Sequence, residues 1–196
     1  MLRQQRPDLF RDDAPHRPNL GNPLDPASDI GPVASAGQFR TVKEYIEIGM
    51  SEGTLIAGGP GPVEGLDRGY FVKPTVFSRL DPKARVVQEE IFGPVLSIVA
   101  YDGIEQGIAI ANDSEFGLSG AVFAADIPQA VAIAKRLRTG QVAVNGGRFN
   151  AKAPFGGFKT SGVGRELGHH GLVEYYELLS MQFPSADDLG SFGQTV

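Results

Sequence analysis

The sequence predicts an α/β fold, with a largely parallel sheet and flanking helices. Short apolar runs typical of strands alternate along the chain with segments whose apolar residues recur at helical spacing. The run Val95–Tyr101 (VLSIVAY) is almost continuously apolar and predicts a strand buried on both faces. Because such runs are separated by helical patterns, we expect parallel pairing through helical crossovers.

The first predicted helix begins after Ser35 and ends at Gly53. Ser35 and Gln38 have the spacing of a capping box, in which a hydroxyl accepts a hydrogen bond from an N–H of the first helical turn. Four side chains would form the apolar face of this helix: Phe39, Val42, Ile46 and Met50.

Two further helices are predicted by the same logic. Asp102 with Glu105 marks the start of a helix through Ala111, and Asp126 with Gln129 marks the start of another. In the latter, the residues expected on one side are Ala130, Ile133, Ala134 and Leu137.

Four other segments are predicted to be extended. Pro74 lacks a backbone N–H, so it predicts an edge position or an irregular strand for the segment that contains it. The segments are residues 54–57, 71–77, 119–124 and 141–145.

Composition excludes several classes of function. The 196 residues carry a net charge of −5 with acids and bases interleaved, so no basic stripe offers a nucleic-acid footprint. There is no cysteine, which excludes disulfides, thiolate metal sites and cysteine nucleophiles from these residues.

The first 20 residues are charged and lack an apolar core, so we expect a poorly ordered leader and no secretory signal. No apolar run is long enough to span a membrane, and we expect a cytoplasmic protein.

The segment QEEIFGPV (88–95) places two carboxylates beside an aromatic ring. A carboxylate can accept hydrogen bonds from ribose hydroxyls, and the adjacent ring can pack on a nicotinamide. The alternative is a solvated acidic end next to a buried strand. Spacing alone favours this second interpretation.

Three other motifs are weak by themselves. Ser161–Gly168 contains a partial dinucleotide fingerprint, but Leu167 replaces its third glycine, so we expect only tight turns that let the backbone approach a neighbour. His169 and His170 are adjacent and lack further ligands nearby, so no metal site is predicted. The glycine-rich loop 146–171 is predicted to be ordered. It contains three phenylalanines, Phe149, Phe155 and Phe158. They could line a substrate funnel or fasten the loop, and the sequence favours neither role.

Taken in order, the motifs closely resemble the C-terminal part of the NAD(P)-dependent aldehyde dehydrogenases. The resemblance covers about residues 21–183 and rests on GNPLDP, IGPV, GYFVKPTVF, EEIFGPV, ANDSEFGLSGAVF, TGQVAVN, APFGGFKTSGVGRELG and GLVEYYE. It implies that Glu90 hydrogen-bonds the nicotinamide ribose and that Phe92 packs beside the nicotinamide of NAD or NADP. It also implies that Phe149 and Phe155 line the substrate tunnel.

The resemblance implies four regions with different roles. Residues 1–20 are a leader unlike the family, and residues 21–176 are a partial catalytic domain. Residues 177–183 are an oligomerisation strand that implies a homo-oligomer or association with another aldehyde dehydrogenase chain, and residues 184–196 are a polar tail.

The family's chemistry uses a cysteine thiolate that attacks the aldehyde, and this sequence contains no cysteine. No catalytic residue is therefore assigned, and the chain alone is expected not to oxidise aldehydes. Two alternatives stay open: one subunit of a split dehydrogenase, and a non-catalytic oligomerisation module.

Overall fold

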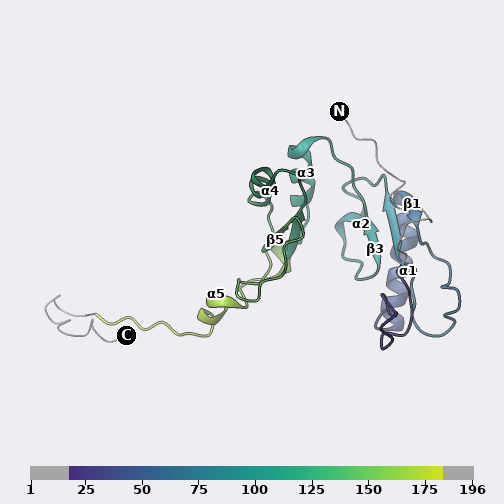
Figure 1. The fold of residues 1–196 in the computed structure, drawn as a ribbon, viewed down its shortest axis with the longest axis horizontal. Helices are drawn as coiled ribbons and strands as arrows, with labels where there is room; N and C mark the ends of the chain where they lie inside the picture. The colour runs from purple at the N-terminus through teal and green to yellow at the C-terminus, as the bar shows by residue number, and fades with distance from the viewer. Residues whose placement is uncertain (1–17, 183–196) are drawn as a thin grey trace. The chain divides into compact units, whose positions relative to one another are not determined.

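The computed structural model describes residues 18–182, which fall into two compact units divided between Glu115 and Phe116. Each unit is described by itself, and Figure 1 labels most of the helices and strands. No helix within the described residues is both long and apolar enough to cross a membrane.

Unit 1 (residues up to 115) is built on a three-stranded sheet in the order β1-β2-β3. β1 (Thr54–Ala57) runs antiparallel to β2 (Thr75–Ser78), and β2 runs parallel to β3 (Val95–Ser97). The register pairs Thr75 with Val95 and Phe77 with Ser97. The sheet is therefore mixed, and the expectation of a largely parallel arrangement holds for only one of its two pairings.

Three helices accompany this sheet. They are α1 (Ala36–Glu52), the short α2 (Arg85–Gln88) and α3 (Gly103–Asn112). α1 begins where the sequence predicted, because Ser35 Oγ accepts a hydrogen bond from the Gln38 N–H at 3.2 Å. It ends at Gly53, whose N–H donates to the Gly49 carbonyl.

The core of unit 1 lies around α1, β2 and α2. Val42, Ile46 and Phe77 are fully buried, and the Phe77 ring lies where a side chain at Gly49 would otherwise stand. The remaining buried hydrophobic residues of the cluster are Val72, Leu80, Ala84, Val86 and Ile91. This packing sets the distance of α1 from the segment that follows β2.

Unit 2 (from residue 116) contains a parallel pair of strands joined by a helix. β4 (Ser119–Val122) pairs in register with β5 (Gln141–Val144), and α4 (Ile127–Ala134) forms the connection and packs on both. Asp126 Oδ2 accepts from the Gln129 N–H at 3.1 Å, as the capping pattern predicted. A glycine-rich loop with a 3₁₀ turn (Lys159–Ser161) leads to α5 (Gly168–Val173).

Several expectations about unit 1 were wrong. β3 is not buried on both faces, since Leu96 is 52% exposed, and β3 lies at one edge of the described sheet. β2 is the central strand, and it begins directly after Pro74, so the missing N–H falls outside the ladder. Met50 is exposed, and Gly49 takes the buried position on α1. Asp102 precedes α3 as expected, but its side chain makes no capping hydrogen bond.

Residues 177–182 form no strand within the described residues, where no segment of this chain pairs with them. The strand expected over residues 177–183 would pair with another subunit, so it stays a prediction. Phe183 and the polar tail lie outside the described residues, as does most of the leader.

Candidate functional site

The segment Glu90–Gly93 forms the turn between α2 and β3, in which the buried Ile91 separates the exposed residues Glu90 and Phe92. Phe92 adopts a left-handed backbone conformation (φ 54°), and its side chain is 76% exposed. A left-handed non-glycine residue costs on the order of 1–3 kcal/mol and persists only where its surroundings enforce it. Glu90 is also exposed, so a carboxylate and an aromatic ring stand on the same turn.

Side chains of α1 enforce this conformation. Gln38 Nε2 donates to the carbonyls of Ile91 (3.0 Å) and Phe92 (2.9 Å). Gly93 lies so close to Val42 that an added Cβ would stand 2.5 Å from Val42 Cγ2. Both contacts cross more than 50 residues of sequence.

Glu89, one residue before the turn, is the centre of an ionic cluster. Its carboxylate accepts from Arg85 Nε (2.9 Å), from Arg85 Nη2 (2.8 Å) and from the Tyr45 hydroxyl (2.6 Å). The hydrogen bonds from Arg85 and then from Tyr45 lower the pKa of Glu89 to about 2. The same carboxylate raises the pKa of Tyr45, chiefly through the hydrogen bond. Sequence reasoning treated Glu89 as a solvated residue; it is exposed, and sequence reasoning missed that it is also bonded to two side chains.

The start of α2 is held by α1 as well. Glu52, the last residue of α1, accepts from the backbone N–H groups of Arg85 (3.0 Å) and Val86 (3.1 Å). These are orphan donors of a helix start, so the carboxylate satisfies both. On another side, Ser97 Oγ donates to the Val86 carbonyl at 2.7 Å. The start of the short helix that precedes the turn is thus held by two different elements.

The second group of predicted residues lies in the glycine-rich loop of unit 2. Phe149 and Phe155 are in contact, with ring centroids 6.0 Å apart in an edge-to-face arrangement. Phe155 exchanges two backbone hydrogen bonds of 2.7 Å with Glu166, which closes the loop. Phe155 also lines a hollow of about 310 Å³, together with Leu118 and Arg165. The loop is ordered, as the sequence predicted.

Glycines in this loop and before β5 serve two different purposes. At Gly140, which precedes β5, an added Cβ would fall 1.6 Å from the Gly156 carbonyl oxygen, so the backbones approach closely there. At Gly162 and Gly164 no such crowding exists, and positive φ angles of 138° and 75° require glycine instead. The expectation that these two glycines permit close approach was therefore wrong.

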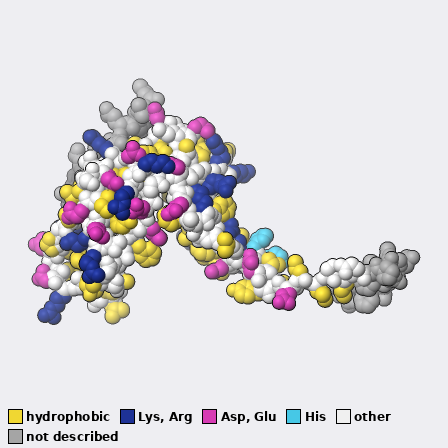
Figure 2. Space-filling model, turned by 180° about the vertical axis from the view of Figure 1, so that it is seen from behind, with side chains coloured by type: hydrophobic (Ala, Val, Ile, Leu, Met, Phe, Trp, Pro, Cys, Tyr) yellow, Lys and Arg dark blue, Asp and Glu magenta, His cyan; other side chains and the backbone are white. Residues whose placement is uncertain are grey.

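The adjacent histidines are exposed, and their rings lie 6.0 Å apart (Figure 2). Within residues 18–182 no group of three or more potential ligands is arranged to hold a metal ion.

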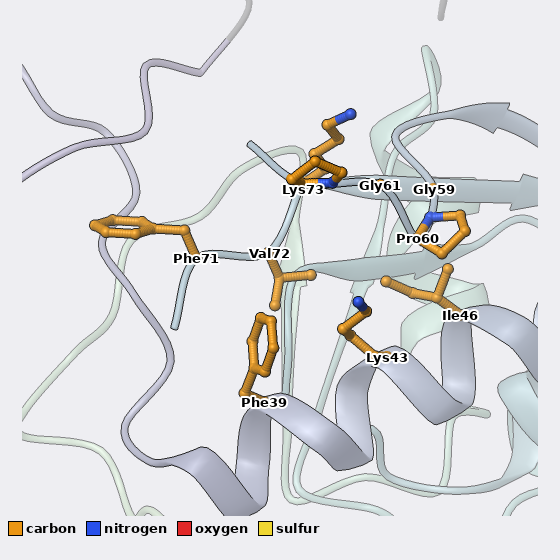
Figure 3. Close-up of a pocket in the computed structure, with 10 residues that line it drawn as sticks. Phe39, Lys43, Ile46, Gly59, Pro60, Gly61, Phe71, Val72 and Lys73 are labelled. Atoms are coloured by element: carbon orange, nitrogen blue, oxygen red, sulfur yellow. The ribbon is translucent and has the colours of Figure 1, made fainter. Parts of the chain in front are cut away.

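Unit 1 has a further hollow of about 140 Å³ between α1 and the loop after β1. Figure 3 shows Phe39, Lys43 and Ile46 projecting from α1 toward Val72 and the loop. None of the site residues predicted from the sequence (Glu90, Phe92, Phe149 and Phe155) lines this hollow.

The chain belongs to the aldehyde dehydrogenase family, whose model matches residues 12–181. It is 47% identical over 163 residues to geranial dehydrogenase of Castellaniella defragrans, covering 83% of this chain and 34% of that protein. A putative aldehyde dehydrogenase of Staphylococcus saprophyticus is 42% identical over the same coverage. The chain therefore spans about a third of the length of these relatives.

Solved structures give the same result. An aldehyde dehydrogenase C mutant of Pseudomonas syringae, in complex with NAD⁺ and octanal, superposes with a TM-score of 0.79 at 45% identity over 81% of this chain and 33% of that one. An aldehyde dehydrogenase of Mycobacterium tuberculosis with NAD⁺ also gives 0.79, at 44% identity over 86% and 36% of the two chains. The α/β architecture is that of a segment of the aldehyde dehydrogenase fold.

The structure thus brings the predicted residues together in two pairs. Glu90 and Phe92 share one turn of unit 1, and Phe149 and Phe155 share one aromatic contact of unit 2. Sequence reasoning missed the residues that hold the first pair. Their signal was present as polar residues seven apart on the first predicted helix: Gln38, Tyr45 and Glu52.

Proposed function

We propose that this chain is the C-terminal portion of an NAD(P)-dependent aldehyde dehydrogenase catalytic domain, which supplies the nicotinamide-facing turn and part of the substrate passage. The exposed carboxylate and exposed aromatic ring on one enforced turn carry this proposal. Glu90 would accept hydrogen bonds from the nicotinamide ribose, and Phe92 would cover one side of the nicotinamide. When bound, the nicotinamide supplies the hydride acceptor for aldehyde oxidation.

The pair Phe149 and Phe155 would line the passage for the aldehyde. Their rings present an apolar wall beside the hollow that Phe155 lines, which suits an apolar substrate. The chemical step also needs a nucleophile that forms a covalent intermediate, and the 196 residues include no cysteine. Turnover therefore requires a cysteine-bearing part that these residues do not contain.

Complementation tests this proposal. The residues of the Pseudomonas syringae protein outside the matched third, with the native cysteine restored, would be expressed as a separate chain and mixed with this one. Octanal and NAD⁺ are then added, and NADH formation is followed by absorbance. We expect turnover in the mixture, and Glu90→Gln should raise the KM for NAD⁺ about 10-fold or more, because a charge-assisted hydrogen bond is lost.

The matched control is Glu64→Gln, which changes an exposed glutamate in the loop after β1. It should leave the KM unchanged. A mixture that associates without producing NADH, or equal effects of Glu90→Gln and Glu64→Gln, would overturn the proposal.

A second candidate function is an oligomerisation module. Several large apolar side chains are exposed near the C-terminal end of the described residues, at Tyr175, Leu178, Leu179 and Met181. In this case the chain would join full-length relatives or copies of itself, and native mass spectrometry would detect mixed oligomers. A monomer that ignores such relatives would contradict it.

A further inference from the structure

One face of α1 carries a stripe of residues at heptad spacing. Positions 38, 42, 45, 49 and 52 are separated by four, three, four and three residues, so their side chains share one side of the helix. From the first to the last, the stripe is roughly 21 Å long at 1.5 Å per residue. Its members alternate between polar residues and small or apolar ones: Gln38, Val42, Tyr45, Gly49 and Glu52.

The polar members contact the α2–turn segment in reverse order. Glu52 binds the first two N–H groups of α2, and Tyr45 binds the side chain of Glu89, which follows α2. Gln38 binds the two carbonyls at the start of the turn. α1 thus runs antiparallel to residues 85–93 and contacts them at three successive levels.

We propose that this stripe, acting together with Glu89, positions the turn that bears Glu90 and Phe92 before any cofactor arrives. The inference rests on the proposed function only for its statement that the turn faces a cofactor. Gln38, Tyr45, Glu52 and Glu89 are positioning residues, and none of them is assigned a contact with substrate or cofactor. Their effect is to hold Phe92 in its left-handed conformation with its ring exposed.

The two adjacent glutamates therefore have separate tasks. The Glu89 carboxylate accepts three hydrogen bonds from two side chains, so its orientation is fixed. Among the described residues no group hydrogen-bonds the Glu90 carboxylate, which stays exposed and leaves its oxygens open to a ligand. Glu89 and Glu90 thus form an internal pair in which each residue is the control for the other.

The test uses backbone ¹⁵N relaxation of the full 196-residue chain without cofactor. We expect order parameters of about 0.85 at Phe92 and Gly93 in the wild type, as for rigid backbone. In Gln38→Ala and in Glu89→Ala they should fall toward about 0.6, while those of α1 amides near Ile46 stay high. Glu90→Gln should leave the order parameters of the turn unchanged.

Tyr45→Phe gives a second route if Glu89→Ala fails to fold, because it removes a single hydroxyl. It should lower the same order parameters by a smaller amount. Unchanged values at Phe92 and Gly93 in all positioning variants would overturn the inference, as would an equal fall in Glu90→Gln. The relaxation experiment contains no cofactor, so it tests only the positioning of the turn. The proposed function is tested separately, by the effect of Glu90→Gln on the KM for NAD⁺.

Discussion

The two units differ in how they support their predicted site residues. Unit 1 has a cluster of eight buried hydrophobic residues, two of them on α1, and holds its turn through side chains 44 to 54 positions away in sequence. In unit 2 the buried hydrophobic residues among those described are Val122 and Ala130, and Phe149 is 64% exposed. The site of unit 1 is held by long-range contacts within that unit. The aromatic loop of unit 2 instead leaves apolar surface exposed, as surfaces that bind a partner do. The difference indicates that unit 1 is the more self-sufficient half of the chain.

Removing a buried ring from unit 1 and an exposed ring from unit 2 should give the largest contrast. Phe77 is fully buried against Gly49, so Phe77→Ala should lower the free energy of unfolding by about 3–5 kcal/mol. Phe123 in unit 2 is 75% exposed, and Phe123→Ala should change the free energy of unfolding by less than about 0.5 kcal/mol. Urea unfolding followed by circular dichroism measures both. Equal losses would contradict the idea that the core is concentrated in unit 1.

A backbone contact offers a smaller effect that acts on unit 2. Gly140→Ala would place a Cβ against the Gly156 carbonyl, so it should cost about 1–3 kcal/mol and loosen the loop that carries Phe155. Hydrogen exchange at the Phe155 and Glu166 amides, which bond each other's carbonyls, reports the loosening. Gly147→Ala is the control, since the nearest atom to its added Cβ is 3.4 Å away. Similar exchange in both variants would show that the loop does not depend on this contact.

The smallest expected effect is the pH dependence of the Glu89 cluster. Folding lowers the pKa of Glu89 from 4.5 to about 2, so its contribution to stability is fully present above pH 4.5 and is lost as the pH falls toward 2. The melting temperatures of the wild type and Glu89→Gln should therefore differ near neutral pH and converge over that window. The cluster is exposed, so the difference should also shrink in high salt. Glu64→Gln should match the wild type at every pH, and a difference for Glu89→Gln that persists at pH 2 would contradict this assignment.

Local signals explain what the sequence could predict. The N-caps Ser35 and Asp126 depend on hydrogen bonds within three residues, so spacing alone located the starts of α1 and α4. The glycine-rich loop was predicted to be ordered from its aromatic content, and in the structure Phe155 packs on Phe149 and exchanges backbone hydrogen bonds with Glu166. These features need no knowledge of distant partners.

Long-range features could not be predicted in the same way. Whether Glu89 or Glu90 is engaged depends on Tyr45, which lies 44 residues away, and spacing alone favoured a solvated end for both. Similarly, Leu96 is exposed and β3 is an edge strand, and the apolar run encodes neither what covers a face of the sheet nor the order of the strands. Gly49 replaced Met50 in the core because the Phe77 ring needs the space above it.

The central claim is that these residues provide a preformed cofactor-facing turn without the nucleophile of the reaction. The most direct test is the rate of NADH or NADPH formation by the purified 196-residue chain, given octanal or other aldehydes and either cofactor. We predict no rate above the protein-free control at any chain concentration, because no cysteine is present to attack the aldehyde. A steady rate that rises in proportion to the concentration of the chain would contradict the account.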